Sequence, residues 1–383
     1  MKDNNDLLEV AHLVTNHTIS KFPQKIAVIA MYGSVAVESQ SKYSDLDMYA
    51  IVDDLDLVNP NLQFIFQNRA IDLWRMDWER AKKIASGEGD PDTPWCVGAS
   101  LFSNCKILYS RSEEDRKHFE KLIKLIKQTE ENKERNLQRI INKFSTIHAY
   151  IERMHFAELN KDFLSARWAS WELINRSCII LSWLNNKYYT KNWGSNIQQV
   201  IKLPIIPKDF EQLVKVIATS QEFDEMISTG RLLITRLRSL IYEKQQKLLV
   251  KKKDSSTLSD DFVGIKEYLG KIYSACNEQD ILLASYAASE LQVWITELVS
   301  EIKGKPAADF NLLKEINEFY IDLGFPDLSD FISNNDFEGL RQATTILEQL
   351  LFHFLTDNGA NILNFHKLKD VRSYLNSKRT NSC

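Results

Sequence analysis

One short segment, residues 31–48, constrains the fold of this chain more than any other part of the sequence. It lies between two apolar runs, residues 25–31 and 48–52, which both contain isoleucine and valine. Short apolar runs bounded by turn-forming or polar residues predict buried strands. Between the runs stands a Gly33-Ser34 pair, and a glycine there lets the backbone turn sharply and approach a ligand closely. We therefore expect a sheet that carries a tight, ligand-facing turn.

Two aspartates come directly before the second apolar run. Asp45 and Asp47 are two positions apart, so on a strand both carboxylates point to the same face of the sheet. Neighbouring carboxylates repel each other unless a cation lies between them. Mg²⁺ in proteins is bound through one or two carboxylates together with water and substrate phosphates. A Gly-Ser turn, in addition, offers N–H groups to a phosphate. The segment therefore predicts a site for a nucleotide and magnesium.

The spacing of these residues resembles the signature of the polymerase-β-like nucleotidyltransferases, in particular that of the antibiotic (kanamycin-type) nucleotidyltransferases. The matching residues are Gly33-Ser34 and, after a spacer, Ser44-Asp45-Leu-Asp47. The resemblance implies that Gly33, Ser34 and Ser44 bind the nucleoside triphosphate. It also implies that Asp45 and Asp47 are catalytic residues that hold the metal.

A third metal-binding and catalytic carboxylate from a neighbouring strand is also implied by the resemblance, and Asp72 is the match. Residues 62–66 have the character of a strand, and alternation along the next strand places Ala70, Asp72 and Trp74 on one face. We therefore expect Asp72 to join the other two acids. Asp77 is the weaker alternative, because a helix is expected to begin directly after it.

The chain departs from the family pattern just after the Gly-Ser turn. Relatives usually carry a basic residue there, whereas residues 35–38 contain none. We expect Lys42 to contact the nucleotide phosphates in its place; the alternative is an ordinary solvated lysine in a loop. A catalytically silent member that retains the fold is a further alternative.

Composition limits the classes of function. A chain of 383 residues is too long for one ordinary core, so two or three domains are expected. A net charge of -4 with interspersed charges argues against a nucleic-acid partner. The five cysteines have no metal-binding spacing, the amino terminus does not resemble a signal peptide, and no apolar run approaches the length of a membrane span. We predict a cytoplasmic protein without a membrane partner.

The predicted fold class is α+β. Residues 1–112 form a nucleotidyltransferase domain with a mixed sheet and flanking helices, and residues 113–250 form a helical bundle that binds the acceptor. Residues 251–262, which are polar and lack periodicity, are predicted to be a linker. Residues 263–383 form a second helical bundle.

Three further segments are informative. Apolar residues at helical spacing predict one long helix ending near Asn160, and residues 163–184, apolar nearly all round, predict a buried helix. A Gly/Pro-rich loop carries Glu88, Asp90 and Asp92, which could attract a polycationic substrate, although such runs are more often solvated turns.

The two predicted bundles resemble each other in sequence. Residues 161–173 align with residues 279–291, and six of the thirteen positions are identical. Upstream, the same offset pairs Tyr150 with Tyr268. We interpret this pattern as a tandem duplication of one helical bundle.

The duplication bears on the choice of general base. In kanamycin nucleotidyltransferase the presumed base is a glutamate on the first long helix of the bundle, and the similar position here is Glu152. Its counterpart in the second copy is Gly270, as expected for a residue needed only beside the nucleotide site. Glu158 and Glu172 are the alternatives, although Arg176 one turn away favours a structural ion pair for Glu172.

The resemblance implies magnesium-dependent transfer of a nucleoside monophosphate, with AMP from ATP as the expected group, to a hydroxyl of a small molecule. Aminoglycoside and lincosamide antibiotics are the expected acceptors, antibiotic resistance is the expected role, and pyrophosphate is released. The alternative is an antitoxin-like enzyme that modifies a protein. We expect a monomer or a homodimer, since the second bundle could replace that of a partner subunit.

Overall fold

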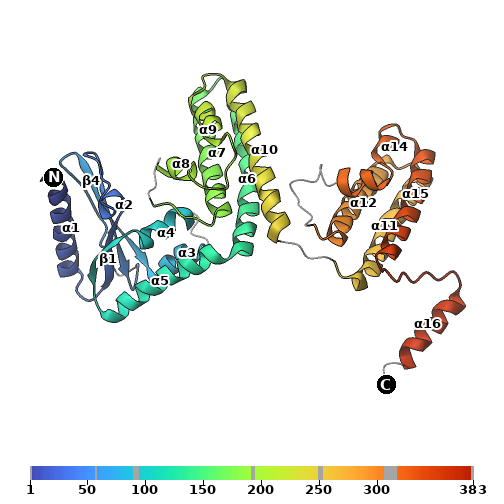
Figure 1. The fold of residues 1–383 in the computed structure, drawn as a ribbon, viewed down its shortest axis with the longest axis horizontal. Helices are drawn as coiled ribbons and strands as arrows, with labels where there is room; N and C mark the ends of the chain where they lie inside the picture. Colours follow the sequence, from blue (N-terminus) through green and yellow to red (C-terminus); the bar gives the residue numbers. More distant parts are fainter. Residues whose placement is uncertain are drawn as a thin grey trace. The chain divides into compact units, whose positions relative to one another are not determined.

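The computed structural model describes residues 2–56, 58–88, 95–190, 195–248, 253–305 and 317–380 (Figure 1). The chain divides into two compact units, residues 1–244 and residues 245–383. The first unit combines a five-stranded sheet with helices, and the described part of the second unit contains helices only. The predicted α+β class, a sheet domain followed by helices, is confirmed.

The sheet of the first unit has the strand order β3-β4-β2-β1-β5. Strands β2 and β4 are parallel and the other neighbours are antiparallel, so the sheet is mixed as predicted. Its elements are α1 (Lys2–Lys21), β1 (Ile26–Tyr32), α2 (Gly33–Ala36), β2 (Leu46–Val52), β3 (Leu62–Phe66), β4 (Arg69–Asp77), α3 (Trp78–Ser86), α4 (Trp95–Ser103) and β5 (Lys106–Ser110). Helix α4 was not predicted from the sequence.

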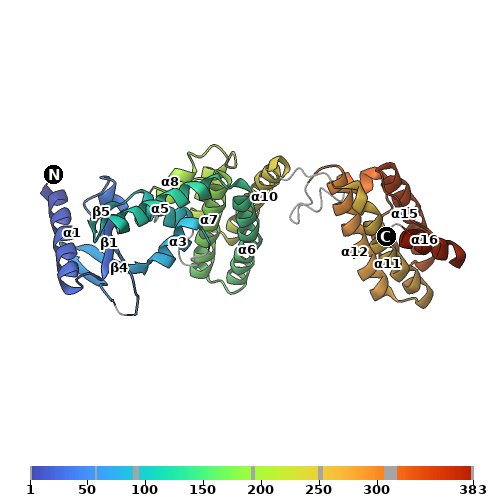
Figure 2. The ribbon, with the colours of Figure 1, turned by 90° about the horizontal axis from the view of Figure 1, so that it is seen from below.

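The two faces of the sheet are covered by different helices. Helix α1 packs on one face through alternate residues of β1 and β2 such as Met31 and Met48, both buried. Helices α3 and α4 lie on the other side (Figures 1 and 2). There the buried Tyr49 donates a hydrogen bond from its hydroxyl to the Leu101 carbonyl of α4, at 3.1 Å. The strand pattern therefore separates an apolar face from one that carries polar groups.

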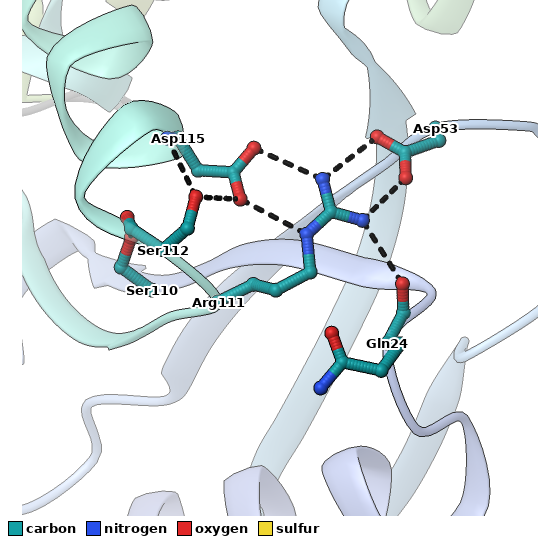
Figure 3. A network of polar contacts seen from close by, with 6 residues as sticks. All are labelled: Gln24, Asp53, Ser110, Arg111, Ser112 and Asp115. Atoms are coloured by element: carbon teal, nitrogen blue, oxygen red, sulfur yellow. Dashed lines mark hydrogen bonds and ion pairs between the residues drawn. The ribbon is translucent and has the colours of Figure 1, made fainter.

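An arginine fixes the end of the sheet where β1 begins and β2 ends (Figure 3). The Arg111 guanidinium pairs with Asp115 through two hydrogen bonds, of 2.9 and 3.0 Å, and also with Asp53 after β2. It donates a further hydrogen bond to the Gln24 carbonyl at 2.9 Å. Asp115 in turn accepts a hydrogen bond from the Ser112 hydroxyl at the start of the next helix. This network joins three parts of the chain through one side chain.

The remaining helices of the first unit are α5 (Glu113–Glu131), α6 (Lys133–Leu159), α7 (Phe163–Leu184), α8 (Ser195–Val200) and α9 (Phe210–Thr219), and α10 (Phe223–Leu248) crosses into the second. The predicted end of the long helix near Asn160 is confirmed. The predicted burial of residues 163–184 is wrong for the first half of α7, where Leu164 and Trp168 are 81% and 53% exposed. Only the second half is enclosed, from Leu173 onward, because packing and not composition alone determines burial.

The second unit contains η1 (Ser255–Thr257), α11 (Leu258–Glu278), α12 (Ile281–Ile302), η2 (Ile321–Leu323), α14 (Ser329–Ser333), α15 (Phe337–Asp357) and α16 (Leu368–Thr380). Helix α11 begins inside the predicted linker of residues 251–262. Its first turns bury Leu258 and Phe262, two apolar residues in an otherwise polar stretch. No helix in the described ranges is both long and apolar enough to cross a membrane.

The second unit repeats local structure of the first. Helices α7 and α12 begin and end at positions exactly one repeat length of 118 residues apart. Asp162 caps the first of them and Asp280 the second, each through its side chain. The residues before the caps, Lys161 and Gln279, share a left-handed backbone with φ of 54° and 53°. Shared caps and turns support the interpretation of a tandem duplication.

Candidate active site

The Gly-Ser turn connects β1 to the short helix α2. Gly33 has φ of +74°, and a Cβ atom at this position would lie 2.8 Å from Oδ2 of Asp47. Glycine is therefore required twice, for its backbone conformation and for the space beside the carboxylate. The Ser34 hydroxyl is buried and has no hydrogen-bond partner among the described residues. An unpartnered buried hydroxyl is costly, and a bound phosphate oxygen could satisfy it.

The three predicted acids converge beside this turn. Asp47 lies on β2 in register with Asp72 on the parallel strand β4. Asp45 lies one residue before β2 begins, so it is not part of the strand as the sequence had suggested, and it is exposed. It is still close enough to act electrostatically on Asp47. The structure thus brings together residues separated by 27 positions in the sequence, from Asp45 to Asp72.

The position of Asp47 disfavours its charged form. Burial raises the pKa of its carboxyl to about 7, and the negative charges of Asp45 and Asp72 contribute to the same shift. None of the three carboxylates forms an ion pair with a described residue. The site is therefore an uncompensated negative cluster, which a cation would relieve.

The three carboxylates are the candidate ligands for a metal ion. Three carboxylates suit Mg²⁺ by chemistry. As the side chains stand, however, no group of three His, Cys, Asp or Glu residues in the described ranges is assembled to hold a metal. One cause is visible at Asp72, whose Oδ1 accepts a hydrogen bond from Gln63 Nε2 at 3.0 Å. Asp45, Asp47 and Asp72 supply the oxygen ligands that a divalent cation uses, but their side chains would have to reorient to share one ion.

Aromatic residues that sequence reasoning did not select surround the acids. Trp74 Nε1 donates a hydrogen bond to the Tyr32 hydroxyl at 2.9 Å. Burial, and then the charge of Asp47, raise the pKa of Tyr32 above its ordinary value. Arg80 lies 5.7 Å from the centre of the Trp74 ring. The sequence alone could have indicated Trp74, because alternation along the strand places it on the same face as Asp72.

Lys42 and Ser44, the other two residues predicted to bind the nucleotide, have only local contacts among the described residues. Lys42 is exposed, and its amino group lies 4.7 Å from the ring of the adjacent Tyr43. The Ser44 hydroxyl accepts a hydrogen bond from the Ser41 N–H at 2.8 Å. Their roles stay predictions. A different lysine, Lys106 on β5, pairs with Glu38 just after α2, with 2.7 Å between the charged atoms.

The candidate bases lie on the helices of the first unit. Glu152 is exposed on α6, and no described contact joins it to the three aspartates. Glu172 pairs with Arg176 at 3.2 Å, as the structural interpretation had predicted. Glu158 lies 3.3 Å from the His155 ring. In the predicted acidic loop, Glu88 pairs with Arg135 at 2.8 Å.

Two other predictions concern residues outside the described ranges. Asp90 and Asp92 of the acidic loop lie there, as does Cys383. The other four cysteines are free thiols: Cys96, Cys105, Cys178 and Cys276.

Comparison with known proteins adds to this geometry. Residues 116–247 match the family described as the KNTase C-terminal domain. The match confirms the predicted resemblance to the kanamycin-type nucleotidyltransferases and supports a nucleotidyltransferase enzyme. Among solved structures, the chain is similar to a nucleotidyltransferase-like protein from Exiguobacterium sibiricum 255-15, with a TM-score of 0.37 and 11% identity over 62% of this chain and 79% of that chain. No curated protein sequence matches.

Proposed function

We propose that this protein transfers a nucleoside monophosphate, with ATP as the expected donor, to a hydroxyl of a small molecule and releases pyrophosphate. The observation that carries the proposal is the convergence of Asp45, Asp47 and Asp72 beside the Gly33 turn, where no positive side chain of the described residues pairs with them. An aminoglycoside or lincosamide antibiotic is the proposed acceptor class. Free cysteines agree with the proposed cytoplasmic location.

Each residue has a proposed part. Gly33 leaves room for the triphosphate, and the unpartnered hydroxyl of Ser34 donates a hydrogen bond to a phosphate oxygen. Mg²⁺, held by Asp45, Asp47 and Asp72, would neutralise the phosphate charge and orient the reacting oxygens. The acceptor hydroxyl attacks the α-phosphorus, a new oxygen–phosphorus bond forms, and the bond to the pyrophosphate oxygen breaks.

The proton of the attacking hydroxyl must pass to a base. We assign it to Glu152, whose carboxylate is exposed and has no described ion-pair partner. Glu172 is the weaker candidate, because its carboxylate is already engaged in an ion pair with Arg176. We expect Glu152→Gln to lower kcat by roughly 10²–10⁴-fold, and Glu172→Gln to lower it less. A larger loss in Glu172→Gln would reverse the assignment; nucleotide binding by both variants serves as the control.

The reaction is tested by pyrophosphate release with MgATP, MgGTP and MgCTP against a panel of aminoglycosides and lincosamides. We expect release that depends on one acceptor class and disappears in the double variant Asp45→Ala/Asp47→Ala. Asp56→Ala, which changes an exposed aspartate beyond β2, is the matched control. Nucleotide binding without release would favour the protein-modifying alternative, tested by labelling protein acceptors with ATP. Absence of nucleotide binding would favour the catalytically silent alternative.

A further inference from the structure

A second polar site lies on the helices of the first unit, among residues not assigned to the proposed reaction. A cavity of about 540 Å³ opens between α6 and α7. Its lining contains three cationic side chains and three neutral ones that can form hydrogen bonds: Arg139, Asn142, Lys143, Thr146, Tyr150 and Arg176. The α6 members recur every three or four residues, so they share one face of that helix.

Positive charge in this cavity is only partly compensated. Arg176 pairs with Glu172 at 3.2 Å, and its Nε donates a hydrogen bond to the Tyr150 hydroxyl at 2.6 Å. Arg139, in contrast, donates to neutral acceptors, the Ser86 carbonyl at 2.7 Å and the Asn136 amide oxygen at 3.2 Å. The Lys143 amino group forms no hydrogen bond or ion pair with a described residue, and the Lys143 carbonyl accepts a hydrogen bond from the Thr146 hydroxyl at 2.7 Å.

Neighbouring positive groups also lower the pKa values of two cationic side chains that line the cavity. The pKa of Lys143 is lowered by burial and then by the neighbouring Arg176. Burial and then Arg135 lower the pKa of Arg139 to about 10. Burial is the larger cause in both cases, and the carboxylates of Glu172 and Glu88 oppose the two shifts only in part. An anion in the cavity would stabilise the charged forms of both side chains.

The second copy of the bundle shows that the fold does not require this cavity. At the repeat offset of 118 positions, every cation is replaced; the pairs are Arg139 and Thr257, Lys143 and Asp261, and Arg176 and Trp294. The residue matching Thr146 is Gly264, and a Cβ atom there would lie 2.4 Å from the Trp294 ring. Trp294 also contacts Tyr268 edge-on, with ring centres 5.8 Å apart. In the second copy an aromatic ring thus occupies the space that is open and cationic in the first.

We propose that the cavity between α6 and α7 binds a phosphate group of a small-molecule ligand. Arg139 and Arg176 offer planar guanidinium groups suited to phosphate oxygens, and Lys143 offers a positive amino group. Tyr150 offers the proton of its hydroxyl, whose oxygen accepts from Arg176, whereas the Thr146 hydroxyl donates to the Lys143 carbonyl. A polycationic aminoglycoside would be repelled by the same groups. The phosphate belongs either to the nucleotide or to a phosphorylated second ligand, and both sources share this chemistry.

The binding claim does not depend on the proposed reaction. Titration calorimetry with sodium pyrophosphate in the absence of metal tests it on the full chain. We expect Lys143→Gln to weaken binding at least fivefold, whereas Lys133→Gln, an exposed lysine on the same helix, should change it less than twofold. Glu172→Gln should tighten binding a fewfold, because it removes the negative charge beside Arg176. Equal affinities for wild type, Lys143→Gln and Glu172→Gln, or no binding at all, would overturn the proposal.

A second variant introduces into the first bundle the glycine and tryptophan that stand at the matching positions, 264 and 294, of the second bundle. Thr146→Gly/Arg176→Trp should abolish pyrophosphate binding and keep a cooperative thermal transition, since the second copy already accommodates this pair. Unchanged affinity in this variant would contradict the site.

Two further probes identify the source of the phosphate. If the nucleotide supplies it, Lys143→Gln weakens MgATP and leaves glucose 6-phosphate unchanged; if a phosphorylated second ligand supplies it, the reverse holds. If neither probe responds to Lys143→Gln, the phosphate assignment is wrong. Asp45→Ala/Asp47→Ala should lose transfer and retain pyrophosphate binding, so failure of the reaction and failure of the cavity are seen separately.

Discussion

The two ends of strand β2 carry carboxylates in opposite electrostatic settings. After the strand ends, Asp53 and the neighbouring Asp115 share the guanidinium of Arg111 (Figure 3). Where the strand begins, Asp45 and Asp47 face Asp72, and the described residues provide no positive partner. Acids that serve stability are paired within the protein, whereas acids that await a ligand are left unpaired. We propose that this difference separates a structural from a functional role for aspartates at the two ends of one strand.

The largest expected effect is on activity, which should depend on the acids at the start of β2 and not on those at its end. Asp47→Asn should lower nucleotidyl transfer by at least about 10³-fold, because it removes a charge proposed to act on the metal and the phosphates. Asp53→Asn, at the far end of β2, should leave the rate per folded molecule within about threefold, since its partner Arg111 lies away from the acids. Pyrophosphate release measured on samples matched for folded protein checks both. Comparable losses in the two variants would remove the distinction.

The second prediction concerns the Arg111 network at the other end of β2 and is measured by stability, not activity. Arg111→Ala should lower the free energy of unfolding by about 3 kcal/mol, because it leaves Asp115, whose side chain is only 10% exposed, without its cation. Urea denaturation measures the change. Arg116→Ala, an exposed arginine on the next helix, is the control and should change stability by less than about 0.5 kcal/mol. A loss below 1 kcal/mol for Arg111→Ala would show that the network is not structural.

The third prediction uses pH. The pKa of Asp47 is raised to about 7 in the folded state, so between its ordinary value and pH 7 the folded protein binds more protons than the unfolded one. Stability without metal should therefore fall as pH rises through this window, by roughly 4 kcal/mol in all and by roughly 2–3 kcal/mol from pH 5 upward, and level off above it. Urea denaturation at pH 5 and pH 8 measures the change.

The matched variant for the pH experiment is Asp47→Asn. It should remove most of the slope, because the amide does not titrate. Added Mg²⁺ should also reduce the slope in the wild-type protein, since metal binding favours the ionised carboxylate. A slope that persists in Asp47→Asn would assign it to other groups.

Much of this architecture follows from local patterns in the sequence. Alternation predicted the face that Asp72 and Trp74 share, and a run that is apolar nearly all round predicted the limits of the helix at residues 163–184. Contacts between separate elements could not be predicted from such patterns. The hydrogen bond from Gln63 to Asp72 depends on the register of β3 with β4. The cationic cavity depends on how α7 packs against α6, which places Arg176 beside residues far from it in the chain.

The contact between Gly264 and Trp294 also couples two substitutions in the history of the repeat. A side chain at position 264 larger than hydrogen would overlap the indole, since even a Cβ atom would lie 2.4 Å away. If the ancestral bundle had the open arrangement, the change to glycine came before or together with the change to tryptophan. A larger side chain at position 264 would require the indole to shift, whereas replacement of the tryptophan would open the space first.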